Sequence, residues 1–236
     1  MRSHREERFI IATLYVLLLA GGLWHALDML QTAMQILAAP MVASLTLLLL
    51  WKNLSTQPDS LQVKEEAQSA PPDSRRARFI LWSLGVFTGS FLIEWLGVKT
   101  GAIFGDYSYG EILQPTLAEV PVVIGCAWLN MLLCSAALAQ RVLPRRGLEH
   151  ALSFSLATAM LMVLFDAFME SAAMKLGYWQ WHAEKIPLRN FAAWLVFGWM
   201  MAYWGARWRI FPRRIATIPM HAYFAQLGYF TIITLF

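Results

Sequence analysis

The residues of this chain that could do chemistry are a few acids inside long apolar segments. Asp166 and Glu170 lie four positions apart in one such segment, and Glu94 lies in another. On a helix, that spacing puts two side chains on one face, with their Cβ atoms about 6 Å apart. Two carboxyls so close in a low dielectric cannot both ionise easily, so one is expected to stay protonated and to be able to act as a general acid. The simpler interpretation, an acid that reaches water or Arg189, is weaker for three acids together than for one.

Two aromatic, glycine-containing stretches accompany these acids. The stretch 94–110, EWLGVKTGAIFGDYSYG, has four glycines and predicts a tight, shaped turn, because glycine allows positive φ and close backbone approach. The stretch 177–194, GYWQWHAEKIPLRNFAAW, carries Tyr178, Trp179 and Trp181, which could line a slot for a long apolar polyene. Both stretches could equally form a belt of aromatic residues at a membrane surface.

Long apolar segments must position these residues. The chain has 236 residues, of which 58% are hydrophobic, against about 45–50% in soluble domains. Several stretches are near the length that a helix needs to cross a bilayer. They lie at 9–27, 33–51, 79–98, 121–141, 149–170, 191–208 and 214–235. We therefore predict an all-α integral membrane protein, with residues 1–236 forming a single bundle of about seven transmembrane helices.

The basic residues predict the orientation of this bundle. Fifteen of the nineteen Lys and Arg residues fall in the N-terminus and in the stretches 52–78, 141–148 and 207–214. Basic residues collect on the cytoplasmic side, so we predict the N-terminus inside and the C-terminus outside, in the inner membrane. The polar stretch 52–78 is then a flexible cytoplasmic loop. This alternation places four acids toward the outer ends of their helices: Asp28, Glu94, Asp166 and Glu170.

Several classes of membrane protein lack the residues that they would need. A retinal protein needs a lysine inside the bundle, and none of the five lysines lies mid-helix. A metal-dependent desaturase needs clustered histidines, and the five here are scattered, so we expect no metal; His25 and Asp28, three apart, are expected to be structural. The net charge of +4 reports orientation and gives no reason to expect nucleic-acid binding. The basic start lacks a small-residue cleavage site, which favours an uncleaved first helix.

Three segments resemble the carotenoid biosynthesis membrane proteins, a family of the carotenoid hydratase type. They are 94–110, 166–181 (DAFMESAAMKLGYWQW) and 186–194 (IPLRNFAAW), and the resemblance covers about residues 79–200. It implies an enzyme that adds water to the terminal C1–C2 double bond of an acyclic carotenoid, by protonation to a tertiary carbocation. Such a reaction needs a protonated carboxyl, a carboxylate that orients water and aromatic faces that stabilise a cation, and it needs no cofactor.

The resemblance implies a role for each candidate residue. Asp166 and Glu170 would supply the acid and its partner, and Glu94 or Asp106 would position water. The end-group pocket would be lined by Phe104, Tyr107, Tyr109, Trp179, Trp181 and Asn190, the last as a hydrogen-bond donor. The expected partners are a carotenoid substrate and membrane lipids, and association with other carotenoid-pathway enzymes is left open.

Two other functions fit the same residues. Protonation followed by ring closure instead of water capture would make a carotenoid cyclase, and the same acid chemistry could serve an isomerase. A non-catalytic carotenoid-binding protein or a proton-coupled transporter would also keep acids in the membrane. A transporter is disfavoured because the sequence shows no inverted repeat or paired half-helices.

Overall fold

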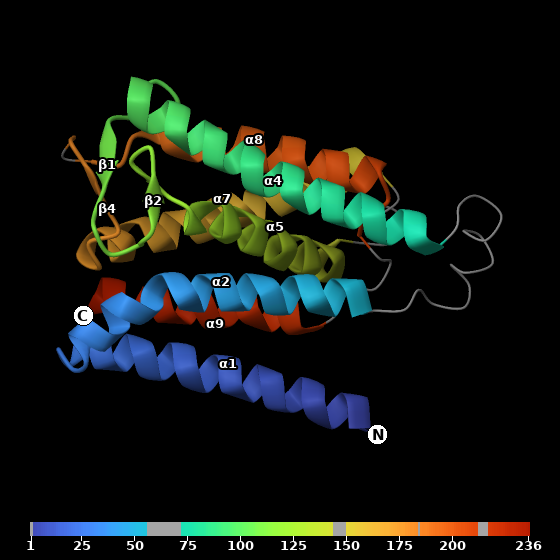
Figure 1. The fold of residues 1–236 in the computed structure, drawn as a ribbon, viewed down its shortest axis with the longest axis horizontal. Coiled ribbons are helices and arrows are strands. Elements are labelled where there is room, and N and C mark those ends of the chain that lie inside the picture. Colours follow the sequence, from blue (N-terminus) through green and yellow to red (C-terminus); the bar gives the residue numbers. More distant parts are fainter. Residues whose placement is uncertain (1, 56–71, 144–149, 184, 212–216) are drawn as a thin grey trace.

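Seven helices form the described part of the molecule. The computed structural model describes residues 2–55, 72–143, 150–183, 185–211 and 217–236. Its helices lie side by side along one direction (Figure 1). They are α1 (Arg2–Ala26), α2 (Gln31–Ser55), α4 (Pro72–Thr100), α5 (Val123–Val142), α7 (Ala151–Lys175), α8 (Leu188–Arg207) and α9 (Thr217–Leu235). Each predicted apolar stretch coincides with one helix; α1 and α4 begin earlier than predicted because arginine, a good helix former, continues the helix beyond the apolar run.

Among the described residues, five helices are long and apolar enough to cross a membrane: α1, α2, α4, α5 and α7. Large apolar side chains on their outer surfaces, such as Val16, Leu47, Leu84 and Leu164, are exposed. A wide exposed apolar surface fits contact with lipid. These are the features of a helical membrane protein, while the crossing of all seven helices and the predicted orientation stay predictions.

The helix α5 is the centre of the bundle. Nearly all of its residues from Val123 to Ala139 are buried, and it packs against α2, α4, α7 and α9. The small buried residues Ser135, Ala136 and Ala137 let neighbouring helices approach closely. The helix α1 lies at the edge of the bundle and packs mainly on α9 (Figure 1).

Two short strand pairs, which the sequence did not predict, cover one end of the helical bundle. The strand β1 (Tyr107–Tyr109) pairs antiparallel with β4 (Trp179–Trp181), and β2 (Thr116–Leu117) pairs with β3 (Val120–Pro121). The two aromatic stretches thus bind each other. Glycine is required here, because a Cβ on Gly110 would lie 2.1 Å from the Gly177 carbonyl oxygen.

The predicted loop at 52–78 is shorter than expected at both ends. Residues 52–55 belong to α2 and residues 72–78 to α4. The remaining positions of this prediction, 56–71, lie outside the described residues.

Candidate active site

Glu94 lies in the last two turns of α4, with only 6% of the residue exposed. Three donors reach its carboxylate. The Tyr107 and Tyr109 hydroxyls donate to Oε2 at 2.5 and 2.8 Å, and the Trp128 indole N–H donates to Oε1 at 2.9 Å. A carboxylate offers about four lone-pair sites, so one site is left for a further donor such as water.

The strand β1 aims both tyrosines at Glu94. Residues two apart in a strand point to the same side, so Tyr107 and Tyr109 turn inward while Ser108 is exposed. Burial raises the pKa of both tyrosines well above the ordinary value, and the negative charge of Glu94 adds to the shift. Both phenols therefore stay protonated and keep donating at ordinary pH.

Asp166 and Glu170 lie on one face of α7, as their spacing predicted. They form the second carboxyl cluster of the site, and Glu94 with its three donors is the first. Asp166 and Glu170 are 0% and 2% exposed. Asn190, near the start of α8, donates Nδ2 to Asp166 Oδ2 at 2.8 Å and to Glu170 Oε1 at 3.1 Å. Within the described part of the chain, no N–H or O–H group donates to Asp166 Oδ1. Two buried carboxyls so close together in a low dielectric cannot both ionise easily.

The strand β4 supplies two further donors to Glu170. The Trp179 and Trp181 indole N–H groups donate to Oε2 at 2.9 and 2.8 Å. In the β1–β4 pair, Tyr107 lies opposite Trp181 and Tyr109 opposite Trp179. Their ring centroids are 5.0 and 6.2 Å apart. One two-stranded sheet therefore carries donors to both carboxyl clusters and sets their relative position.

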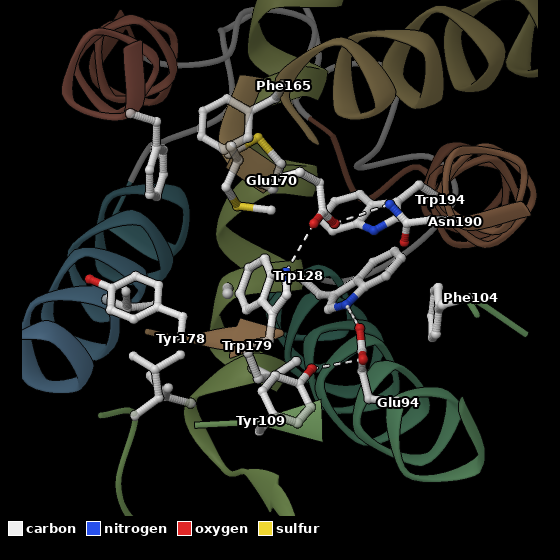
Figure 2. Close-up of a pocket in the computed structure, with 18 of the residues that line it drawn as sticks. Glu94, Phe104, Tyr109, Trp128, Phe165, Glu170, Tyr178, Trp179, Asn190 and Trp194 are labelled. Atoms are coloured by element: carbon white, nitrogen blue, oxygen red, sulfur yellow. Dashed lines mark hydrogen bonds between the residues drawn. The ribbon is translucent and has the colours of Figure 1, made fainter. Parts of the chain in front are cut away.

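A cavity of about 100 Å³ is lined by both Glu94 and Glu170. Its wall contains Trp128 and Trp194, whose rings stack with centroids 4.2 Å apart and planes 17° apart. Figure 2 shows Trp128 between Glu170 and Glu94. The rest of the lining is mostly apolar and includes Phe104, Tyr109, Phe165, Met169, Tyr178 and Phe230. Carboxyl groups thus face aromatic surfaces, which can stabilise a positive charge.

The sequence model of the family described as carotenoid biosynthesis protein matches residues 69–236. The chain belongs to this family. The bisanhydrobacterioruberin hydratase of Haloarcula japonica is 29% identical to it over 132 residues, which cover 54% of this chain and 44% of that protein. The match therefore spans less than half the length of this relative. No solved structure matches the chain.

The carotenoid biosynthesis resemblance that the sequence predicted is thereby confirmed. Both carboxyl clusters and the β1–β4 sheet lie within the matched residues. The helices α1 and α2 lie outside them.

The structure brings the predicted site residues together, except Asp106. The Asp106 side chain is 71% exposed, and its carboxylate lies 3.1 Å from His182 Nδ1. Asp106 immediately precedes Tyr107, and side chains alternate along an extended segment. When the tyrosine turns inward, Asp106 therefore points outward, and it does not line the cavity.

The fourth predicted acid near the outer face, Asp28, is also away from the site. It is exposed in the turn between α1 and α2, with φ at 53°. His25 Nδ1 contacts Gln31 Oε1 at 2.9 Å, which is a structural contact. Over the described residues, no three His, Cys, Asp or Glu side chains gather in a way that could hold a metal ion.

Among the cavity-wall residues that are not predicted site residues, four carry a side-chain N–H group: Trp128, Trp194, Asn130 and Gln226. Asn130 donates to Gln226 at 2.9 Å. An amide or an indole N–H inside an apolar helix needs a hydrogen-bond partner. This need indicates that Trp128 has a hydrogen-bond partner, but it does not identify Glu94 as that partner.

Proposed function

We propose that the protein is a carotenoid hydratase that adds water to the terminal C1–C2 double bond of an acyclic carotenoid. The observation that carries the proposal is the buried Asp166–Glu170 pair, whose two carboxyls are bridged by the Asn190 side-chain amide. Such a pair holds a proton in a low dielectric, where it can be transferred to an apolar substrate. The family and the similarity to a bisanhydrobacterioruberin hydratase support a carotenoid substrate.

Glu170 is the general acid in this proposal, and Asp166 is its proton partner. Glu170 lines the cavity, whereas Asp166 lies behind it, fully buried. The proton adds to C2, the π electrons of the C1–C2 bond form the new C–H bond, and C1 becomes a tertiary cation. Water then attacks C1, and its surplus proton returns to the carboxyl pair. The product gains one water, and no external oxidant or reductant is needed.

The rest of the cavity stabilises the cation and orients the water. The stacked faces of Trp128 and Trp194 present π electrons to C1. Glu94 accepts three hydrogen bonds, as an ionised carboxylate does, and its negative charge also favours the cation. Its remaining acceptor site can hold the attacking water.

The cavity suits the end of a polyene rather than the whole molecule. A volume of about 100 Å³ holds a small apolar group, so the remaining polyene would lie between the helices or in the lipid. This geometry fits an enzyme that spans the inner membrane and takes its substrate from the bilayer.

Co-expression in a lycopene-accumulating bacterium, with mass spectrometry of the pigments, tests the proposal. Wild type is expected to give a product heavier by one water. Glu170→Gln and Asp166→Asn are expected to lose about 10²–10⁴-fold in rate, the usual contribution of a general acid. Asp106→Asn is the matched control and should keep activity, because that carboxylate lies outside the cavity.

Other results would point to other functions. A product with the mass of the substrate would replace hydration by cyclisation or isomerisation. Pigment that binds the folded protein without conversion, for lycopene and for longer acyclic carotenoids alike, would contradict catalysis and favour a binding protein.

A further inference from the structure

A hydratase consumes one water in every turnover, so a site enclosed by membrane helices needs a supply of water. The following inference rests on the proposed function. The lining of the active-site cavity is mostly apolar, and its polar groups are a few side chains such as Glu94 and Glu170. Water therefore needs a polar route to C1.

A second, polar cavity lies beside the active site. It measures about 60 Å³ and is lined by His25, Gln31, Gln35, Lys175 and Tyr178, together with Met34, Ile112 and Leu176. It lies where the end of α1, the start of α2 and the end of α7 meet. Gln35 and Lys175 are exposed, so the cavity reaches the surface of the molecule.

This second cavity has the size and the partners to hold water. One water needs about 10–15 Å³ of such volume and two to four polar partners. The amides of Gln31 and Gln35 and the ring of His25 provide donors and acceptors. The Lys175 ammonium donates two of its three N–H groups to the carbonyls of Ile233 and Thr234, so one N–H group is left to bind water.

Tyr178 is the side chain that separates the two cavities, since it lines both. Figure 2 shows its hydroxyl pointing away from Glu170 and Glu94. The Tyr229 side chain is a close neighbour of this hydroxyl. The backbone is fixed on both sides, because Tyr178 N donates to Ala173 O and Gly110 N donates to Tyr178 O, each at 2.9 Å. The fixed backbone therefore holds the ring between the two cavities.

We propose that the polar cavity is the water inlet of the active site, and that Tyr178 passes single waters from it to the site of attack. Bulk water stays excluded by the ring, so the cation meets one nucleophile at a time. The route begins at the same end of the bundle as the β1–β4 sheet.

The experiment follows the cation in heavy water, using the full-length protein in lipid and an acyclic carotenoid. Protonation and its reversal leave deuterium in recovered substrate, whereas water capture gives the hydrate. The double change Gln31→Leu with Gln35→Leu should lower hydrate formation at least tenfold, while deuterium in recovered substrate stays or rises. Tyr178→Phe, which keeps the ring and removes the hydroxyl, should shift the same ratio in the same direction.

Thr32→Leu is the control, because it adds similar apolar bulk to an exposed position of α2 outside the cavity. An unchanged ratio of hydrate to deuterated substrate in both inlet variants would overturn the inlet. A parallel fall of hydrate and deuterium would also overturn it, since the acid step would then be what changed. Wild type that forms no hydrate and takes up no deuterium would overturn the proposed function itself.

Discussion

At the scale of single residues, Trp128 connects the parts of the site. Its N–H donates to Glu94, and its ring stacks on Trp194. The acids could be predicted from the sequence because a charge inside an apolar segment is conspicuous. Trp128 could not, since a tryptophan in an apolar helix is also an ordinary core residue, and only the neighbouring helix shows that its N–H has an acidic partner.

Trp128→Phe separates the hydrogen bond from the aromatic ring. The change keeps an aromatic ring but leaves Glu94 Oε1 without its indole donor. An unsatisfied buried acceptor costs about 1–3 kcal/mol, so we expect a hydration rate about tenfold lower and a lower thermal midpoint. Trp194→Phe removes the same ring area without removing a donor to Glu94. Equal losses in the two variants would contradict a role for the hydrogen bond.

At the scale of elements, the β1–β4 sheet holds the site together, and it is the least predictable element. The two strands have three residues each and lie far apart in the chain. Runs so short show no period that distinguishes a strand from a turn. That both stretches are structurally ordered could be predicted from their glycines and aromatic rings, but their pairing and register could not.

Gly110→Ala tests whether this sheet positions the carboxyl donors. The added Cβ would lie 2.1 Å from the Gly177 carbonyl oxygen and must push the strands apart. Overpacking of this kind costs about 1–3 kcal/mol, and the indoles of β4 should move away from Glu170. We expect hydration to fall at least tenfold and tryptophan fluorescence to change, with helical circular dichroism retained.

Gly85→Ala is the matched control for this change. Gly85 lies in α4, and a Cβ there would meet nothing within 4 Å. Alanine is a better helix former by roughly 0.5–1 kcal/mol, so stability should stay or rise and activity should be kept. Full activity of Gly110→Ala would show that the sheet does not position the site.

The helix α2 contributes to the site although it lies outside the family-matched residues. Val42 lines the active-site cavity, and the Thr46 hydroxyl donates to the Cys126 carbonyl at 3.1 Å. We expect Val42→Phe to fill part of the cavity and to lower kcat/KM about tenfold for a bulky end group. Leu47→Phe changes a 65% exposed residue of the same helix and should have little effect. Equal kinetics for the two variants would remove α2 from the substrate site.

At the scale of the whole molecule, the site gathers at one end of the bundle. Both carboxyl clusters, the sheet and the polar cavity lie toward the ends of α4 and α7 and the start of α2. The positions of the seven helices could be predicted from the apolar runs alone. The packing that makes α5 the centre could not, because several runs are equally apolar and only the three-dimensional contacts distinguish them.

The crossing of α8 and α9 decides the topology. In the described chain, α8 packs along α7, and α9 packs along α1 and α5. Helices that lie beside membrane-spanning neighbours occupy the same layer, so we expect both to cross. The exposed positions 180 and 209 should then lie on opposite sides, with position 180 outside and position 209 inside.

Labelling of introduced cysteines tests this topology. A membrane-impermeant thiol reagent should modify Gln180→Cys in intact cells, and Arg209→Cys only after permeabilisation. The unchanged protein gives the background from Cys126 and Cys134, which are half-buried and buried. Labelling of both Gln180→Cys and Arg209→Cys in intact cells would mean that α8 does not cross. Labelling of Gln180→Cys only after permeabilisation would invert the bundle and place both carboxyl clusters and the polar cavity nearest the cytoplasm.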